Sequence, residues 1–299
     1  QYPDAAIQGI RDLLKLKKAD DIPIGNIESI KMGTTVATNA LLERKGENTL
    51  LAITSGFADI LRIGYQQRPE LFALDINLPD MLYSKVIEIE ERVDVNGKIL
   101  TKLDTLKSEK LLKSAFNEGF KSIAIVLIHG YRYQDHENKL KLIAKEIGFE
   151  QISVSHNVSP LMKIIPRGDT TVVDAYLSPI LRQYVTQVKN ALGSDKNDSG
   201  KLKFMQSNGG LTDANYFQGK DAILSGPAGG VVGMVKTGEK VGLTKLIGFD
   251  MGGTSTDVCH YNGEYERTLE TEVAGVRLRS PMMLINTVAA GGGSILHFD

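Results

Sequence analysis

The sequence is organised around one stretch, Ile247-Gly-Phe-Asp-Met-Gly-Gly-Thr-Ser-Thr-Asp-Val258. An apolar run from Leu246 to Phe249 leads into Asp250 and a Gly252-Gly253 turn, and apolar and polar residues alternate again from Val258. This pattern predicts a strand, a tight turn and a returning strand.

The turn has the composition of a phosphate-binding site. The adjacent glycines Gly252 and Gly253 allow positive φ and let backbone N–H groups approach a ligand. Three hydroxyl residues add donors at the same rim: Thr254, Ser255 and Thr256. Asp250 and Asp257 flank them, and each carboxylate would repel a phosphate 4 Å away by roughly 4 kcal/mol at an effective dielectric near 20. A Mg²⁺ ion held by Asp250 and Asp257 through water would turn that repulsion into attraction. We predict a nucleotide-phosphate hairpin with Mg²⁺; the alternative is an ordinary Gly-Gly hairpin.

Length and composition are those of an ordinary globular protein. The 299 residues predict about two domains, and 42% hydrophobic with 24% charged residues is typical of a chain with a sizeable core. A net charge of −1 gives no reason to expect nucleic acid or anionic membrane as a partner. One cysteine, Cys259, excludes an internal disulfide and suits a reducing compartment, so we expect a cytoplasmic protein. No apolar stretch is long enough to span a bilayer.

Periodicity predicts alternating helices and strands, and hence an α/β fold. Helices are expected over 3–17, 106–119, 136–147, 171–192 and 225–240. Strands are expected over 49–54, 86–95, 122–128, 152–154 and 203–206, with a hairpin turn at Asn96-Gly97. We also expect a hydroxyl-capped helix from Gly33 to a stop at Gly46, and a domain boundary that divides the chain into 1–165 and 166–299.

Two further glycine motifs resemble parts of a nucleotide site. Ser225-Gly-Pro-Ala-Gly-Gly230 opens a helix, where N–H groups and Gly226 and Gly229 would suit an anion; the alternative is a close contact that needs small residues. Gly291, Gly292 and Gly293, within Ala290-Gly-Gly-Gly-Ser294, could pass beneath a nucleotide base or ribose. The alternative is that this cluster is only flexible, as glycine clusters near a chain end often are.

Other candidate residues carry weaker signals. Thr34, Thr35, Thr38 and Asn39 could form a substrate-facing turn, although plain helix capping is the default interpretation. The histidines share no ligand spacing, and His136-Glu137 lacks the second histidine of a zinc helix. We interpret Cys259 as a small buried hydrophobe, with the alternative that it faces the phosphate site.

Five motifs together resemble one family. They occur in the order found in the hydantoinase/oxoprolinase family: Gly33-Thr-Thr-Val-Ala-Thr-Asn-Ala-Leu-Leu-Glu-Arg44, Ser207-Asn-Gly-Gly210, Ser225-Gly-Pro-Ala-Gly-Gly230, Asp250-Met-Gly-Gly-Thr-Ser-Thr-Asp257 and Ala290-Gly-Gly-Gly-Ser294. The segments 68–72 and 91–97 are also similar to it. That family includes ATP-dependent 5-oxoprolinases, N-methylhydantoinase A subunits and ketone carboxylase subunits, and the resemblance covers essentially the whole chain.

The resemblance implies a fold and an activity. The fold would be a two-domain ATPase of the actin, sugar-kinase and heat-shock-chaperone type, with ATP and Mg²⁺ as cofactors. Asp250 and Asp257 would be catalytic, and Ser207 and Asn208 would join the substrate candidates. The reaction would be ATP-dependent ring opening of a small cyclic amide, such as 5-oxoproline or N-methylhydantoin, through phosphorylation of the amide oxygen. Alternatives are an ATP-using ketone carboxylase subunit and a non-catalytic ATPase-fold binding module. A homo-oligomer, or a partner resembling a hydantoinase B-type subunit or domain, is implied.

Two departures from the family pattern lead us to expect a fragment, incomplete at both ends. The family carries an earlier Asp-x-Gly-Gly-Thr-x-Thr-Asp hairpin, and nothing before Gly33 matches it. The chain also ends at Asp299, soon after the triple glycine. Residues 1–165 would be the remainder of an N-terminal domain, and 166–299 the start of a hydantoinase A domain. We expect this piece alone to hydrolyse ATP poorly or not at all.

Overall fold

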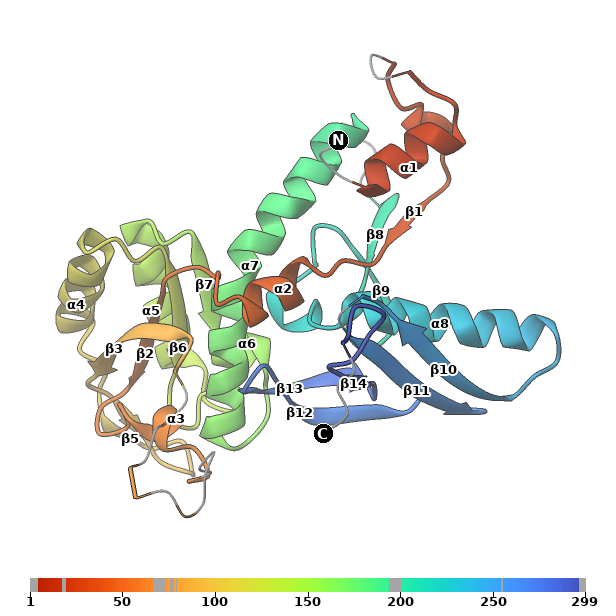
Figure 1. Ribbon diagram of the computed structural model, residues 1–299. Coiled ribbons are helices and arrows are strands. Elements are labelled where there is room, and N and C mark those ends of the chain that lie inside the picture. Colours follow the sequence, from red (N-terminus) through yellow and green to blue (C-terminus); the bar gives the residue numbers. More distant parts are fainter. Residues whose placement is uncertain are drawn as a thin grey trace.

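The computed structural model describes residues 5–17, 20–66, 72, 74–75, 78, 80–193, 200–253 and 255–295. They form a mixed α/β protein, as predicted (Figure 1). Its main sheet has four parallel strands in the order β3-β2-β6-β7: β2 (Thr49–Thr54), β3 (Tyr83–Ile89), β6 (Ser122–Val126) and β7 (Gln151–Val154). The strands predicted at 49–54 and 122–128 are confirmed, and both are buried along their whole length because the sheet is covered on both faces.

Helices cover both faces of this sheet. One face carries α4 (Thr105–Asn117) and α5 (Asp135–Ile147). The other carries α2 (Val36–Leu42) and α7 (Ile164–Leu192). Neighbouring strand residues therefore belong to different cores: Leu50 packs in the cluster of α4 and α5, and Leu51 in that of α7. The predicted helix 136–147 is confirmed, and it ends where Gly148 adopts a φ of +110°.

The long helix α7 connects the sheet with the rest of the molecule (Figure 1). Its N-terminal half, from Pro166 to Ser178, is buried, and its C-terminal half packs on α1 (Ala5–Leu13). The prediction placed its start at residue 171, seven residues too late. The missed turns contain polar residues that are buried because the helix backbone pairs them: Thr170 Oγ1 donates to Pro166 O, and Thr171 Oγ1 to Arg167 O, each at 2.7 Å.

A second sheet joins residues far apart in the sequence. It contains β1 (Ile30–Met32), β8 (Leu202–Met205) and β9 (Leu211–Asp213), with β1 parallel to β8 and β8 antiparallel to β9. The N-terminal segment therefore lies beside residues that follow α7. The expected division at residue 165 stays a prediction.

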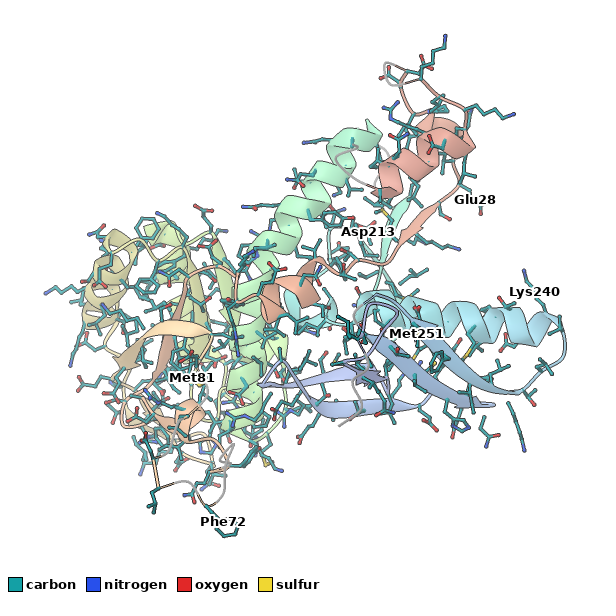
Figure 2. The ribbon with its side chains drawn as sticks, viewed as in Figure 1. Glu28, Phe72, Met81, Asp213, Lys240 and Met251 are labelled. Carbon is teal, nitrogen blue, oxygen red and sulfur yellow. The ribbon has the colours of Figure 1, made fainter. Side chains whose placement is uncertain are left out.

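The last quarter of the chain begins with α8 (Ser225–Lys240), as predicted. A three-stranded antiparallel sheet follows: β10 (Lys245–Met251), β11 (Thr256–Asn262) and β14 (Asn286–Val288). A hairpin is inserted between β11 and β14: β12 (Arg267–Val273) and β13 (Val276–Met283). In Figure 2, Lys240 lies at the outer end of α8, and Met251, the last residue of β10, lies nearer the middle of the molecule.

Short elements complete the description. They are η1 (Ile24–Asn26), α3 (Ile60–Ile63), β4 (Arg92–Val93), β5 (Ile99–Thr101), α6 (Ser155–Val158) and η3 (Gly219–Asp221). The predicted hairpin at Asn96-Gly97 is confirmed between β4 and β5, with φ of +88° at Gly97. None of the helices in the described ranges combines the length and the apolar character that crossing a bilayer requires.

One predicted helix end is wrong. The helix expected to run to Gly46 ends at Leu42, because the chain turns away at Arg44, which has a φ of +53°. Gly46 is small for another reason: a Cβ there would overlap the ring of Tyr176 on α7. The glycine thus fits a packing constraint that comes from a residue far along the chain.

Candidate phosphate site

The predicted hairpin is present, and its two carboxylates lie opposite each other. Asp250 and Asp257 are paired residues of the β10–β11 ladder. The turn closes with a 2.9 Å hydrogen bond from Gly252 N–H to Ser255 O. Thr254 lies outside the described residues. A pair of carboxylates at the mouth of a glycine turn is a suitable position for a hydrated divalent cation.

The triple-glycine segment lies directly on this turn. Gly292 N–H donates to Gly252 O at 2.9 Å, and Gly293 N–H donates to Gly253 O at 2.8 Å. A Cβ at Gly291 would lie 2.6 Å from Gly252 O, so only glycine fits there without movement. Two motifs that the sequence singled out separately therefore form one backbone assembly.

Hydroxyl groups hold the flanks of the assembly. Thr256 Oγ1 donates to Ala290 O at 2.6 Å, which ties β11 to the glycine segment. Thr287 Oγ1 donates to Asp257 Oδ1, also at 2.6 Å. Asp257 is partly buried, whereas Asp250 is exposed. The bond from Thr287 fixes the orientation of the Asp257 carboxylate.

A pocket of about 280 Å³ opens between α8 and the hairpin. Its lining includes Asp250, Asp257 and Cys259 from the strands and Pro227 and Gly230 from the first turns of α8. Burial raises the pKa of the Cys259 thiol, which keeps it protonated. Cys259 thus faces the pocket, the alternative that the sequence left open, although its environment does not favour a thiolate.

The start of α8 is held by the Gly33–Asn39 segment. Ser225 Oγ donates to Thr34 O at 2.9 Å, and Leu224 N–H donates to Thr38 Oγ1 at 2.9 Å. A Cβ at Gly226 would come within 3.3 Å of Thr35 Cγ2. The close contact between small residues, one of the two interpretations of this motif, is therefore present at Gly226.

The remaining substrate candidates bond mainly within the protein. The N-cap residue of α2 is Thr35, and its side chain makes no capping bond; its Oγ1 accepts from Asn39 Nδ2 at 3.4 Å. Thr34 Oγ1 accepts from Val36 N–H, the first of the helix, at 3.2 Å. Ser207 Oγ donates to Ile223 O at 2.6 Å, and Asn208 Oδ1 accepts from Gly210 N–H at 2.7 Å. The bond from Ser207 fixes the loop that precedes α8, and the bond to Asn208 fixes the turn after β8. Gly229, on the next turn of α8, faces Met205 at ordinary contact distance.

Asp250 and Asp257 supply two ligands for a cation. Across the described residues, no group of three or more His, Cys, Asp or Glu side chains is placed to hold a metal ion. A Mg²⁺ ion usually keeps several waters and uses one or two carboxylates together with nucleotide phosphates. The pair therefore fits a cation that arrives with a nucleotide.

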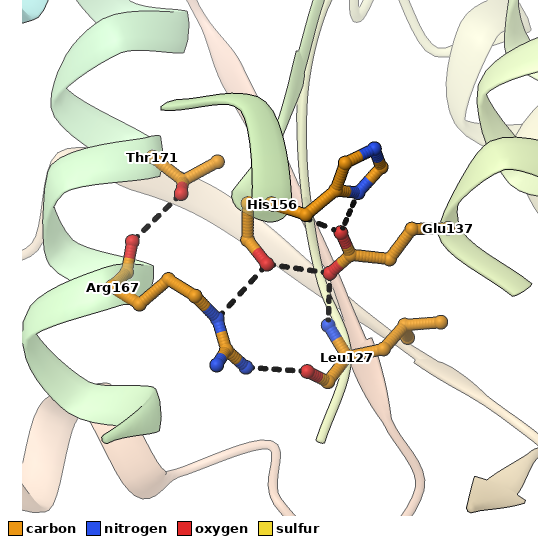
Figure 3. Close-up of polar contacts among 6 residues, drawn as sticks. Leu127, Glu137, His156, Arg167 and Thr171 are labelled. Carbon is orange, nitrogen blue, oxygen red and sulfur yellow. Dashed lines mark hydrogen bonds and ion pairs between the residues drawn. The ribbon is translucent and has the colours of Figure 1, made fainter. Parts of the chain in front are cut away.

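A buried polar network, which the sequence did not predict, lies at the carboxyl ends of the parallel strands (Figure 3). Glu137 is fully buried; Oε1 accepts from Leu127 N–H at 2.9 Å and Ser155 Oγ at 2.5 Å, and Oε2 lies 2.6 Å from His156 Nδ1. Arg167, also buried, donates to Ser155 Oγ and to Leu127 O. Burial lowers the pKa of Arg167, and Glu137 opposes that shift.

A second buried pair extends this network. His136 Nδ1 lies 2.8 Å from Glu91 Oε2, and Thr54 Oγ1 donates to Glu91 Oε1 at 2.5 Å. As a sequence pattern, the His136-Glu137 dipeptide resembles only an incomplete zinc motif. Its two members instead bond to separate partners that are distant in the sequence.

Known proteins resemble the chain along its whole length. The profile described as "Hydantoinase/oxoprolinase N-terminal region" matches residues 1–148, and "Hydantoinase/oxoprolinase" matches 167–299. A 5-oxoprolinase 1 from Arabidopsis thaliana is 44% identical over 100% of this chain and 26% of its own length. The chain spans about a quarter of the length of the first curated relatives it matches.

Two solved structures share the fold. The ATP-dependent caprolactamase from Pseudomonas jessenii superposes with a TM-score of 0.81 at 27% identity, over 100% of this chain and 44% of that one. A nucleotide-free acetone carboxylase has the same TM-score at 22% identity, over 99% and 44%. The second likeness is one of fold alone.

Proposed function

This chain belongs to the hydantoinase/oxoprolinase family, and from that membership we propose that the protein opens a small cyclic amide at the expense of ATP. One observation carries the proposal: the Gly252-Gly253 turn, the triple glycine and the facing carboxylates Asp250 and Asp257 form one assembly. Such an assembly offers backbone donors to phosphate and two acidic groups to the cation that accompanies it.

Each part of the assembly has a proposed role. Gly252 N–H is bonded within the turn, so the phosphate donors would be the N–H groups of Gly253 and Ser255 with the hydroxyl of Thr254. Asp250 and Asp257 would hold a Mg²⁺ ion through water, and that ion would neutralise charge on the transferring phosphoryl group. Gly291, Gly292 and Gly293 would lie beneath the nucleotide. The first turns of α8 would face the same ligand through Pro227 and Gly230, which line the pocket. Gly226 and Gly229, the glycines singled out in the sequence, instead face Thr35 and Met205.

The chemistry follows from the stability of amides. The amide oxygen attacks the γ-phosphorus of ATP, and ADP leaves as the bridging P–O bond breaks. Phosphorylation makes the carbonyl carbon electrophilic, so water adds there and the C–N bond breaks as the ring nitrogen takes a proton. Hydrolysis of the resulting acyl phosphate releases inorganic phosphate. Without activation, amide resonance would leave the ring carbon a poor electrophile.

The proposal also covers the fold type, the partners, the cellular location and the substrate residues. We infer a two-domain ATPase fold of the actin type, in which this hairpin is one half of a clamp on ATP. A homo-oligomer or a hydantoinase B-type partner, and a cytoplasmic location, belong to the same proposal. The candidates Thr34, Thr35, Thr38, Asn39, Ser207 and Asn208 would act on the substrate, and three of them, Thr34, Thr38 and Ser207, bond to residues 223–225 at the start of α8.

A substrate panel tests the reaction. The full-length protein that contains residues 1–299 would be incubated with Mg-ATP and one of three substrates: 5-oxoproline, N-methylhydantoin or acetone. Each incubation would be run with and without bicarbonate. We expect phosphate release together with a ring-opened product, independent of bicarbonate. Turnover only with a ketone and bicarbonate would favour a carboxylase, and nucleotide binding without turnover of any substrate would favour a binding module.

A further inference from the structure

Arg279 on β13 is a buried cation with an unused hydrogen-bonding edge. Its side chain is 6% exposed, and its Nε and Nη2 atoms are buried without a hydrogen-bond partner among the described residues. Its backbone is well held, since Arg279 N–H donates to Thr170 Oγ1 at 2.8 Å. Glu270 approaches the opposite edge, at 4.0 Å from Nη1, and is itself 58% exposed.

This arrangement is costly for a protein without a ligand. A buried donor left unpaired costs about 1–3 kcal/mol, and more when it is charged. Arg167 lies close enough for Arg279 to lower its pKa further, so two cations share the region. Glu137 compensates Arg167 through Ser155, whereas the ion-pair partner of Arg279 among the described residues is the exposed Glu270, 4.0 Å from Nη1 and away from the Nε–Nη2 edge. The imbalance favours an anion beside Arg279.

The geometry of the unused edge specifies the anion. Nε and Nη2 project their N–H groups in parallel from one side of the planar guanidinium. This fork matches the two oxygens of a carboxylate, and such bidentate pairs are among the strongest hydrogen bonds in proteins. Tyr65 and Glu270 interact electrostatically with Arg279 and are 51% and 58% exposed, so the buried guanidinium has neighbours that reach the surface.

We propose that Arg279 is a specificity residue that receives the carboxylate of the substrate. The inference rests on the proposed function and narrows it, because it selects a cyclic amide with a carboxylate on its ring, such as 5-oxoproline, over a neutral lactam. Arg279 would bind and orient this substrate through its Nε and Nη2 edge. It takes no part in bond making.

Binding without ATP tests this assignment separately from catalysis. Calorimetry on the full-length protein would compare 5-oxoproline with 2-pyrrolidinone, the same ring without the carboxylate. We expect wild type to bind 5-oxoproline on the order of 10- to 100-fold more tightly, as loss of a charged hydrogen bond implies. Arg279→Met should abolish this preference, and Arg279→Lys should recover it only in part because lysine lacks the fork. Arg182→Gln, on the outer side of α7, is the matched control and should retain it.

Thermal unfolding separates this role from a structural one. Replacing a buried unpaired cation by an apolar side chain should leave the ligand-free melting temperature equal or higher. A lower melting temperature in Arg279→Met, with its preference for 5-oxoproline over 2-pyrrolidinone unchanged, would overturn the assignment. Three binding results for wild type would also overturn it: equal affinity for the two rings, no binding of either ring, or tighter binding of inorganic phosphate than of 5-oxoproline. A carboxylate preference without ATP turnover in the full-length protein would sustain the assignment and refute the proposed reaction.

Discussion

A Cβ on Gly291 would lie 2.6 Å from the carbonyl oxygen of Gly252, so the triple glycine and the hairpin turn fit together only through bare backbone. Gly291→Ala should force these segments apart and weaken Mg-ATP binding by at least about tenfold, a loss near 1.4 kcal/mol. Titration with a fluorescent ATP analogue would measure the loss.

Gly233→Ala on α8 is the matched control, because a Cβ there meets nothing within 4 Å. Alanine at a helix position should raise stability by roughly 0.5–1 kcal/mol and leave nucleotide affinity unchanged. Equal nucleotide affinity in Gly291→Ala and wild type would show that the two glycine motifs do not form one site.

Thr287→Val should test the orientation of Asp257. The substitution removes the 2.6 Å hydrogen bond to Asp257 Oδ1 while keeping the branched shape that suits β14. We expect the affinity for Mg-ATP to fall by on the order of tenfold, with a smaller effect on ATP in the presence of EDTA. An identical loss with and without Mg²⁺ would mean that the carboxylate does not act through the cation.

Glu137→Gln should be strongly destabilising. Glutamine cannot replace a carboxylate that accepts bonds from Leu127 and Ser155 and lies beside His156, and it leaves Arg167 without its nearby anion. The expected loss in the free energy of unfolding is about 3–5 kcal/mol, measured by urea denaturation.

An exposed acid provides the comparison. Glu109→Gln on α4 breaks a surface ion pair with Lys113 and should cost under about 0.5 kcal/mol. If Glu137→Gln unfolds at the same urea concentration as Glu109→Gln, the network is not what holds the ends of β6 and β7 together.

Asp169 should make stability depend on pH. Burial raises its pKa to about 6, and the hydrogen bond with Arg277 reduces this shift without reversing it. The folded state then binds a proton that the unfolded state has lost, so Asp169 favours folding more as pH falls from about 6 towards 4. Relative to Asp169→Asn, wild type should gain about 3 kcal/mol over this interval. Parallel stability profiles for the two proteins between pH 4 and 7.5 would contradict this.

Local patterns predicted much of the fold. The uninterrupted apolar runs gave β2 and β6 in place, Gly148 ends α5, and the Gly252-Gly253 hairpin has the predicted strands. These features depend on neighbouring residues, which is why periodicity and turn residues reveal them.

Features that depend on distant partners were not predicted. α7 begins early because its polar residues are paired after burial, and Gly46 is required by the ring of Tyr176. The contacts of Glu137 with His156 and of Arg277 with Asp169 join residues 19 and 108 positions apart. No single-sequence pattern carries such pairings.

The candidate site likewise has a part that the sequence predicts and a part that only the structure shows. Its motifs were visible as separate glycine and hydroxyl clusters, yet their meeting required the structure: Gly293 reaches Gly253 across 40 residues, and Thr38 reaches Leu224 across 186. The roles assigned to these residues stay predictions, and Thr254 and the segment 68–72, apart from Phe72, lie outside the described residues.

Coupling between ATP hydrolysis and ring opening is the most direct test of the central claim. Phosphate and ring-opened product from 5-oxoproline would be measured together in full-length wild type, in Asp257→Asn, and in Glu264→Gln, an exposed acid on the turn after β11. We predict that phosphate and product rise together in wild type and Glu264→Gln, and that both fall by at least about 100-fold in Asp257→Asn, as loss of a group that stabilises transition-state charge implies. Ring opening that proceeds without ATP, or that Asp257→Asn retains, would contradict the account.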